Sequence, residues 1–252
     1  MEPILKVEGL TKIFSSKGRE DYTAVDGVSF SMMPGEKLAI IGESSSGKTT
    51  VVNMVARLLD ATSGMITLDG EDITRAKGRR MKGIYGKMQM VFQTPADSFD
   101  PRRTLGDGIA ESLVNRGTAK KEAMARAEQL LGLCGLGKEF VKRYPHEVSG
   151  GQCQRAAIAR AVAISPKLLI LDEATSALDV TVQKDILELL TTLKEERNMS
   201  YLFICHDIAL VQNFCDRVLV MYHGKIVEEG IPDDVIRHPK EDYTRNLINS
   251  VL

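Results

Sequence analysis

The segment GESSSGKT at residues 42–49 constrains the fold more than any other part of the chain. It fits the pattern G-x-x-x-x-G-K-[ST], in which backbone N–H groups surround phosphate oxygens. An apolar run at residues 37–41 precedes it and predicts a strand, and the apolar spacing of TTVVNMVARLL after Gly47 predicts a helix. A strand, a glycine-bounded loop and a helix in this order favour an α/β fold with a phosphate loop over a mere serine-rich turn.

The residues of this loop also predict its chemistry. We expect the amino group of Lys48 to reach the β- and γ-phosphates of a nucleotide and the hydroxyl of Thr49 to bind Mg²⁺. The positive end of the following helix adds an attraction for anions. The candidate nucleotide-binding residues of the segment are Gly42, Ser44, Ser45, Ser46, Gly47, Lys48, Thr49 and Thr50.

Two carboxylates stand at the end of a second apolar run. Residues 168–171 predict a buried strand, and Asp172 and Glu173 follow it directly. A phosphate loop requires a carboxylate beside its metal ion, and hydrolysis requires a group that polarises the attacking water. We therefore expect Asp172 to hold Mg²⁺ and Glu173 to act as a general base. The alternative is an acidic loop after a buried strand.

A second glycine-rich element, VSGGQ, occupies residues 148–152 and precedes the helical pattern CQRAAIARAVAI. Ser149 is a favourable N-cap residue, and the two glycines leave backbone N–H groups that an anion can approach. On these residues alone, an ordinary capped helix is the better interpretation.

The order of strand and helix patterns predicts a parallel sheet with a helical insertion. Helical patterns broken by prolines fill residues 94–165, which we interpret as the insertion. A strand at 168–171, a helix at 182–196 and a strand at 201–205 follow in βαβ order. Residues 218–228, with HGK at the centre, predict an edge hairpin. Other strands are expected at residues 4–7, 28–32 and 37–41, and an exposed loop at residues 15–21.

Composition excludes several classes of protein. The 252 residues can bury a substantial core, and the formal net charge of −1 gives no global attraction for nucleic acid or anionic lipid. No window approaches the roughly 18 apolar residues that a membrane span requires, and the first residues lack the apolar block of a secretory signal. We therefore expect a cytoplasmic protein that has no nucleic-acid partner.

Cysteines and local charge point to no further site. The four cysteines form no C-x-x-C pair and predict neither a disulfide nor a zinc site, so we expect buried thiols. One basic cluster is interpreted as a solvated face, because no aromatic residues are interleaved with its cations. The cysteines are Cys134, Cys153, Cys205 and Cys215, and the basic residues are Arg75, Lys77, Arg79, Arg80 and Lys82.

Six motifs in this order resemble the nucleotide-binding subunit of an ATP-binding cassette (ABC) transporter over nearly the whole chain. They are GESSSGKTT, VFQTP with Gln93, VSGGQ, LLILDE, Ser176-Ala177-Leu178-Asp179 and ICHD with His206. The resemblance implies an α/β fold: a P-loop NTPase core with a mainly parallel sheet, an N-terminal antiparallel β subdomain and an inserted α-helical subdomain. It implies a single ABC ATPase domain over residues 1–252. Residues 1–93 and 166–252 would form the RecA-like core with the antiparallel β part, and residues 94–165 the insertion with the signature motif.

The resemblance also implies roles for individual residues. Gln93 would contact Mg²⁺ or its water and sense a membrane partner, and His206 would hold the γ-phosphate. Ser149 and Gly151 would contact the γ-phosphate of a nucleotide held by another chain, Gln152 would be a further nucleotide-binding residue, and Asp179 would lie at the dimer interface. Without the other motifs, His206 would be interpreted as a core histidine and Gln93 as an ordinary loop amide.

A single subunit completes no active site in this family. Two copies, or one copy and a paralogue, would face each other head to tail, so that Ser149 of one chain closes over Lys48 of the other. The resemblance implies ATP and Mg²⁺ as cofactors. It further implies two membrane permease subunits and an extracytoplasmic substrate-binding protein as partners, with this chain peripheral on the inner face of the membrane.

Three positions are ambiguous or depart from the family pattern. Phe14 in TKIF resembles the aromatic residue that stacks on adenine, with Tyr22 as the rival and simple core packing of Phe14 as a third possibility. Ser45 stands where relatives mostly have glycine, so a positive φ there would strain the loop. Cys153 replaces a longer polar residue and puts one helix-surface contact in doubt.

Further segments resemble the ATPases of oligopeptide, dipeptide and nickel importers. They are FQTPADSFDPRRT, RYPHEVSGGQCQR, CDRVLVMYHGKIVEEG and HPKEDYTRNLINSVL. We therefore expect an ATPase that energises import of peptides, nickel or metal-chelates, although the sequence does not name the cargo. The alternatives are a soluble ABC-type ATPase of a phosphonate-degrading complex and a nucleic-acid-bound ATPase. The near-neutral charge and the lack of a long coiled coil oppose the latter.

Overall fold

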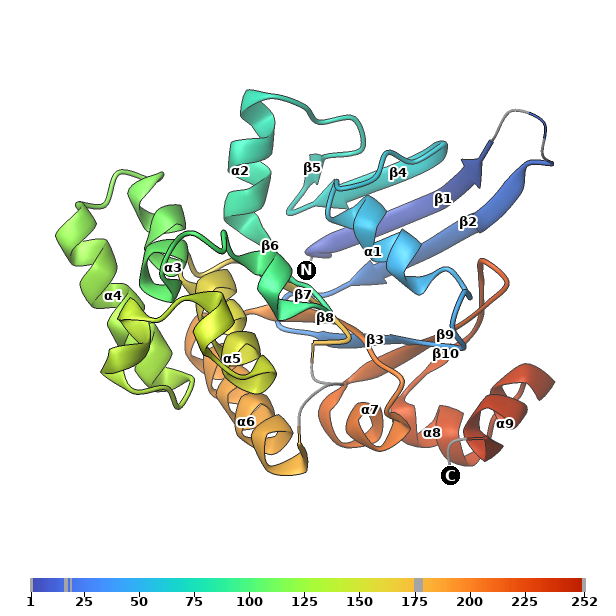
Figure 1. Cartoon of the computed structure of the whole chain (residues 1–252). Helices are drawn as coiled ribbons and strands as arrows, with labels where there is room; N and C mark the ends of the chain where they lie inside the picture. Colours follow the sequence, from blue (N-terminus) through green and yellow to red (C-terminus); the bar gives the residue numbers. More distant parts are fainter. Residues whose placement is uncertain (1, 16–17, 19, 175–178, 251–252) are drawn as a thin grey trace. The chain divides into compact units, whose positions relative to one another are not determined.

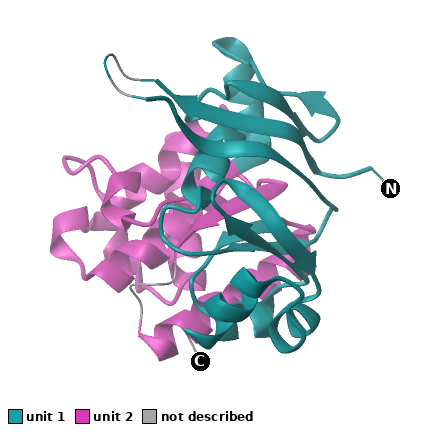
Figure 2. Ribbon diagram, turned by 90° about the vertical axis from the view of Figure 1, so that its right-hand side faces the viewer, with its two compact units in different colours: residues 1–88, 200–252 teal, residues 89–199 magenta. Residues whose placement is uncertain are grey.

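The computed structural model describes residues 2–15, 18, 20–174 and 179–250. The chain divides into two compact units, the first formed by residues 1–88 and 200–252 and the second by residues 89–199 (Figure 2). The element labels used below are those of Figure 1.

The first sheet of the first unit is antiparallel. Its strands lie in the order β2-β1-β4-β5, and Leu5 of β1 pairs with Met32 of β2 on one side and with Leu68 of β4 on the other. Because side chains alternate across a strand, Leu5 and Val7 are buried while Lys6 between them is exposed. The strands are β1 (Leu5–Phe14), β2 (Tyr22–Met32), β4 (Ser63–Leu68) and β5 (Glu71–Asp72).

The second sheet of this unit positions the phosphate loop. Within the unit its strands lie in the order β10-β9-β3-β8, with β3 parallel to both β8 and β9 and with β9 antiparallel to β10. Strand β3 is almost entirely buried and ends directly before the loop, and helix α1 (Lys48–Val55) begins directly after it. The strands are β3 (Lys37–Ile41), β8 (Ser200–Ile204), β9 (Arg217–Tyr222) and β10 (Lys225–Gly230).

Short helices at the C-terminal end of the chain pack on one another. Ile208, Ile236 and Ile248, one from each of three helices, form a buried hydrophobic cluster. This contact fixes the C-terminal helix α9 to the body of the unit. The helices are α7 (Ile208–Phe214), α8 (Pro232–Arg237) and α9 (Asp242–Asn249); α2 (Arg79–Lys87) precedes them in the chain.

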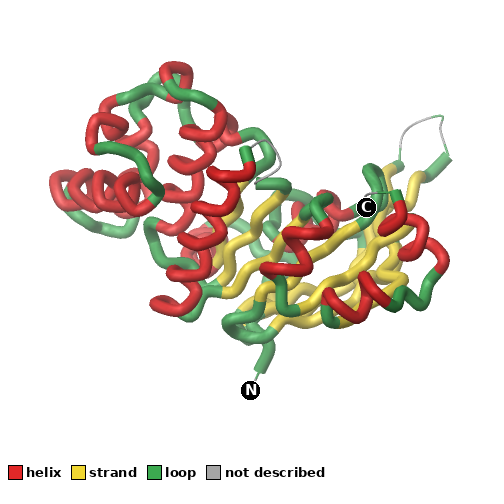
Figure 3. Tube along the Cα trace, turned by 90° about the horizontal axis from the view of Figure 1, so that it is seen from below, coloured by secondary structure: helices red, strands yellow, loops and turns green. Residues whose placement is uncertain are grey.

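The second unit is mainly helical. Figure 3 shows the helices of the chain in red and its strands in yellow. Strands β6 (Met88–Val91) and β7 (Leu168–Asp172) are neighbours in a sheet, and β7 is buried throughout. Helices α3, α4 and α5 contact one another. The helical elements are α3 (Leu105–Val114), α4 (Lys120–Leu133), α5 (Gly150–Val162) and α6 (Val180–Arg197), with the 3₁₀ turns η1 (Pro95–Ser98), η2 (Lys138–Lys142) and η3 (Pro145–Glu147).

The α/β fold class predicted from the sequence is confirmed, with one antiparallel sheet, one parallel-rich sheet and a helical part. The predicted hairpin at 218–228 is β9 and β10, joined at His223 and Gly224, which both have positive φ. The helical insertion expected at residues 94–165 falls within the second unit, which is longer and also contains β7 and α6. The loop expected at residues 15–21 lies partly outside the described residues.

All four cysteines are free and buried, as predicted. Burial raises the pKa of the Cys134 and Cys215 thiols to about 12, so these thiols stay protonated at neutral pH. Cys153 of α5 is 3% exposed, so its side chain is buried, as expected of a thiol that replaces a longer polar residue and puts a helix-surface contact in doubt. Among the described residues, no helix combines the length and apolar character needed to cross a bilayer.

Arg217 of β9 contacts β2, β10 and Glu36, the residue that precedes β3. Its guanidinium donates to Glu36 at 2.7 Å, to Glu229 and to the carbonyl oxygen of Ser31, and only 24% of the side chain is exposed.

We expect Arg217→Met to lower the free energy of unfolding by about 2 kcal/mol, because it leaves partly buried acceptors unpaired. Lys225→Met is the control. It breaks the exposed pair with Asp26 and is expected to cost less than about 0.5 kcal/mol in urea denaturation. Equal losses for the two variants would contradict the proposed role of Arg217.

Candidate functional site

The phosphate loop is shaped by two glycines that no other residue can replace without strain. Gly42 has φ 150° and Gly47, the N-cap of α1, has φ 105°. A Cβ atom on Gly47 would lie 2.5 Å from the carbonyl oxygen of Ala24 and 2.8 Å from Cε of Met221. The loop is therefore folded tightly against β2 and β9, which leaves its other face for a ligand.

Lys48 is the only lysine among the buried charged residues of the described chain, at 4% exposed. Its Nζ donates to the carbonyl oxygens of Gly42 at 2.8 Å and Glu43 at 2.7 Å, and lies 3.4 Å from Oγ of Ser46. The Lys48 side chain thus folds back along the loop that precedes it, and its ammonium group binds the first two carbonyl groups of that loop. Because Lys48 occupies the first position of α1, its charge adds to the positive end of the helix.

The first turn of α1 offers backbone donors to an anion. The N–H groups of Thr49 and Thr50, in the first turn, have no acceptor within the helix, whereas Val51 N–H bonds to the carbonyl oxygen of Gly47 at 3.0 Å. The turn contains no acidic side chain that would compete with an anion, and Thr49 is exposed. These residues can bind phosphate oxygens and present a hydroxyl to a metal ion.

Ser45 adopts the left-handed backbone conformation. Its φ is 66°, and its side chain is exposed. A non-glycine residue in this region carries a steric penalty of about 1–2 kcal/mol. The loop therefore stores backbone strain at Ser45.

This strain gives a testable stability change. We expect Ser45→Gly to raise the free energy of unfolding by about 1 kcal/mol, since the relief of strain exceeds the entropy that glycine adds to the unfolded chain. Ser44→Gly is the matched control because Ser44 has no positive φ, and we expect it to lower stability slightly. Urea denaturation measures both. A Ser45→Gly variant less stable than the parent would contradict the strain argument.

The two aromatic candidates for adenine stacking face each other across a strand pair. Phe14 at the end of β1 pairs with Tyr22 at the start of β2, and they are 42% and 57% exposed. Core packing of Phe14 is therefore wrong, because the ring lies at the surface with the Lys12 ammonium 5.0 Å from its centroid. Either ring can present a face to a base.

His206 also lies at the surface. It follows the buried strand β8, as predicted, but its side chain is exposed, so the interpretation as a core histidine is wrong. The neighbouring Asp207 caps α7 through a bond from Leu210 N–H to Oδ1 at 3.0 Å. The imidazole of His206 thus lies just beyond the end of β8 and directly before the N-cap of α7.

In the second unit, the end of β7 carries the two predicted carboxylates. Asp172 is the last residue of the strand and is 6% exposed, and Glu173 leaves the strand with φ 49°. Nε2 of Gln93 donates to Oε2 of Glu173 at 2.7 Å. The structure therefore brings Gln93 and Glu173 together, although they are 80 residues apart in the chain.

A polar pocket of about 380 Å³ joins the remaining predicted residues of the second unit. Ser149 and Gln152 form a capping box: Gln152 N–H donates to Ser149 Oγ at 3.3 Å, and Ser149 N–H donates to Gln152 Oε1 at 2.9 Å. Asp179 caps α6 through Val182 N–H at 2.9 Å. Ser149, Gly151, Gln152 and Asp179 all line the pocket, together with Arg155. Residues 176–178 of the predicted motif lie outside the described residues.

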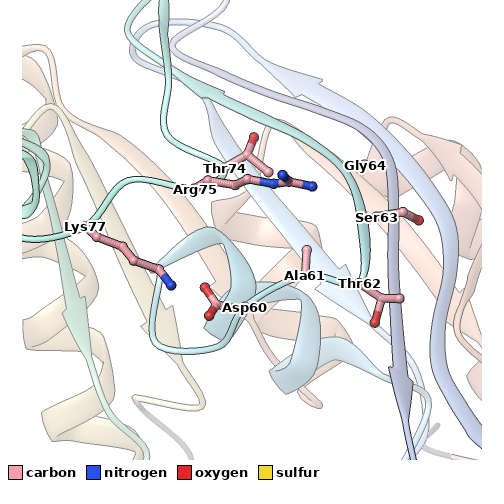
Figure 4. Close-up of a pocket in the computed structure, with 8 residues that line it drawn as sticks. All are labelled: Asp60, Ala61, Thr62, Ser63, Gly64, Thr74, Arg75 and Lys77. Atoms are coloured by element: carbon pink, nitrogen blue, oxygen red, sulfur yellow. The ribbon is translucent and has the colours of Figure 1, made fainter.

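The basic cluster belongs to a different part of the first unit. Arg75 and Lys77 line a pocket of about 290 Å³ beyond the C-terminal end of α1, where Figure 4 shows Lys77 pointing toward Asp60. A hydrogen bond from Arg57 and the charges of Arg57 and Lys77 hold the pKa of Asp60 below its usual range. All five basic residues of the cluster are exposed, which agrees with a solvated face.

Two residues that the sequence does not mark support the phosphate loop from a distance. Met221 limits the space behind Gly47, and the hydroxyl of Tyr243 accepts a hydrogen bond from Glu43 N–H at 3.0 Å. Neither contact has a local sequence signal, because each joins segments more than 170 residues apart. Among the described residues, no group of three or more His, Cys, Asp or Glu side chains could hold a metal ion by itself.

Comparison with known proteins agrees with this geometry. The family model described as ABC transporter matches residues 25–176. The structure resembles that of the ATP-binding cassette MJ0796, solved as a dimer in a post-hydrolysis state with ADP and Pi. That match has a TM-score of 0.84 and 29% sequence identity, and covers 90% of this chain and 98% of the other.

Curated relatives are similar over nearly the whole chain. The oligopeptide transport ATP-binding protein OppF of Bacillus subtilis is 42% identical over 253 residues, which cover 99% of this chain and 83% of that protein. The glutathione import ATP-binding protein GsiA of Pectobacterium atrosepticum is 43% identical over 257 residues. The chain spans only 41% of the length of GsiA.

Proposed function

The chain belongs to the ABC transporter family, and we propose that it binds and hydrolyses ATP as the energising subunit of an importer. The observation that carries this proposal is the phosphate loop at the end of β3, with Lys48 spanning the loop and the first turn of α1 following it. Such a loop binds the phosphates of a nucleotide through backbone N–H groups and the lysine ammonium.

The residues present fit a nucleotide with Mg²⁺. The cradle formed around Gly47 has no room for a side chain, and the oxygen donors of Thr49, Asp172 and Gln93 are of the kind that Mg²⁺ prefers. We assign Thr49, Gln93 and Asp172 to the metal. Because Mg²⁺ usually takes one or two carboxylates together with phosphate oxygens, the lack of a larger acidic cluster among the described residues does not oppose it. When bound, the ion neutralises charge on the phosphates.

The hydrolytic step is assigned to Glu173. Its carboxylate accepts the proton of the attacking water, and the bond from Gln93 orients the carboxylate. His206 is assigned to the γ-phosphate, since an exposed imidazole at a strand end can donate to a phosphate oxygen. Phe14 or Tyr22 would stack on the adenine.

The pocket at the start of α5 is assigned to the nucleotide of a second ATPase chain. Ser149, Gly151 and Gln152 stand at the N-terminus of a 13-residue helix, where backbone dipoles favour an anion, and Asp179 lines the same pocket. The similar cassette MJ0796 was solved as a dimer, which supports a pair of ATPase chains. We propose that the two chains face each other head to tail. The pair would be two copies of this chain or this chain with a paralogue.

The relatives guide the choice of transported substrate and partners. Because OppF is named for oligopeptides and GsiA for glutathione, we propose a peptide or peptide-like cargo, with nickel or a metal-chelate as the second choice. The partners would be two permease subunits at the inner face of the membrane and an extracytoplasmic substrate-binding protein. Residues 94–165, the helical insertion, would meet the permease near Gln93. The names of these relatives do not favour the phosphonate-degrading complex.

Two experiments test the proposal. The purified chain should hydrolyse ATP in the presence of Mg²⁺, and Lys48→Ala should lose most of its ATP affinity. Wild-type affinity for ATP in that variant would count against the phosphate-loop assignment. A strain lacking the gene should lose uptake of labelled peptides, with nickel uptake measured in parallel. Unchanged uptake of both would remove the importer assignment.

A further inference from the structure

The C-terminal helix contacts the phosphate loop directly. Tyr243, in the first turn of α9, accepts a hydrogen bond at its hydroxyl from Glu43 N–H at 3.0 Å. Its ring stacks on Tyr222 of β9, with the ring centroids 3.9 Å apart and the planes at 27°. Burial raises the pKa of the Tyr243 phenol, so the hydroxyl is neutral at physiological pH.

This hydrogen bond acts on the peptide group that also holds Lys48. The N–H of Glu43 and the carbonyl of Gly42 belong to one planar peptide unit. The carbonyl accepts from Nζ of Lys48 at 2.8 Å, while the N–H donates to Tyr243. Because the unit is rigid, fixing the N–H direction also fixes the direction of the carbonyl that Lys48 contacts.

Helix α9 is held firmly enough to serve as a support. Glu228 of β10 is 8% exposed and accepts from the N–H groups of Lys240 at 3.0 Å and Glu241 at 3.2 Å, the residues that lead into the helix. Burial by itself would raise the pKa of Glu228, but hydrogen bonds, including those from the Lys240 and Glu241 N–H groups, hold it below its usual range. Ile248 anchors the other end of the helix in the cluster with Ile208 and Ile236.

The turn between β9 and β10 supports the loop from the same region. Gly224 N–H donates to the carbonyl oxygen of Ser46 at 3.0 Å. The His223 ring lies edge-on to Tyr222 with centroids 4.1 Å apart, so the turn is packed against the residue on which Tyr243 stacks. Glu43 and Ser46, near the two ends of the loop, are thus held by elements that follow residue 220.

We propose that Tyr243 is a positioning residue for nucleotide binding, which sets the Gly42–Glu43 peptide and thereby the place of the Lys48 ammonium. This inference rests on the proposed function. None of the predicted nucleotide-binding residues belongs to α9. The inference adds that this helix sets the affinity of the loop for a nucleoside triphosphate. A displacement of α9 would release the peptide unit and weaken binding.

Tyr243→Phe tests the proposal because it retains the ring stack and removes only the acceptor of Glu43 N–H. We expect the dissociation constant for ATP, measured by calorimetric titration of the full chain, to rise about three- to tenfold, the effect of one lost hydrogen bond. The maximal hydrolysis rate at saturating ATP should stay within about twofold, because no reacting group changes. Tyr85→Phe removes the hydroxyl of an exposed tyrosine in α2, elsewhere in the first unit, and should leave the affinity unchanged.

Hydrogen exchange provides a readout that needs no nucleotide. In Tyr243→Phe the amide of Glu43 should exchange at least about tenfold faster than in the parent, whereas Tyr85→Phe should not alter it. Weaker ATP binding together with faster exchange supports the proposal. Parental affinity, or parental exchange at Glu43, overturns it. If the parent chain itself binds no ATP, the proposed function fails, and the exchange measurement still decides whether Tyr243 holds the loop.

Discussion

Substitution of Glu173 by glutamine is expected to lower the maximal rate of ATP hydrolysis by about 10²–10⁴-fold while ATP still binds. Glutamine keeps the shape of the side chain and an oxygen that can accept from Gln93, but it cannot take a proton from water. The loss should therefore fall on kcat and leave the dissociation constant for ATP within about threefold of the parent. Steady-state hydrolysis and equilibrium titration with ATP measure the two quantities.

A trapped assembly is the second signature of this variant. If two chains share each nucleotide, ATP that is bound but not hydrolysed should hold them together, and gel filtration with ATP should show a dimer that the parent does not accumulate. Glu139→Gln, at an exposed carboxylate of the same unit, is the control and should retain parental hydrolysis. Undiminished turnover in Glu173→Gln would remove this residue as the base.

The local parts of the site were predictable from sequence because their contacts are local. The pattern S-x-x-Q at residues 149–152 predicts a cap at the start of a helix, and the structure has that cap with both hydrogen bonds. The loop between β3 and α1 was predictable for the same reason, since the strand, the glycines and the helix are adjacent in the chain. The serine at position 45 could be identified as a departure, and its positive φ is confirmed.

Contacts between distant segments could not be predicted in this way. Tyr243 and Glu43 are separated by 200 residues, and neither residue type predicts a hydrogen bond between them. The rivalry between Phe14 and Tyr22 has a related cause, because antiparallel pairing of β1 and β2 places the two rings opposite each other. Sequence identified both aromatics, but strand register makes them neighbours that are both exposed.

Replacement of Gly47 by alanine is expected to weaken ATP binding at least about 100-fold and to destabilise the fold. Two costs add at this position. The φ of 105° is unfavourable for any L-residue, and the new Cβ would lie 2.5 Å from the carbonyl oxygen of Ala24, a backbone atom that cannot rotate away. The loop must move outward, so Lys48 and the first turn of α1 leave the positions that a phosphate would occupy.

Gly117→Ala separates these two costs. Gly117 has φ 97°, close to that of Gly47, but its Cβ would have nothing within 4 Å. It should therefore incur only the backbone penalty, about 1–3 kcal/mol in urea denaturation, with parental ATP affinity. Gly47→Ala should exceed that loss by roughly 2 kcal/mol, because overlap with packed backbone is added to the same strain. If Gly117→Ala weakened ATP binding as much as Gly47→Ala, backbone strain alone would explain the result, and the close approach of the loop to β2 would have no role in binding.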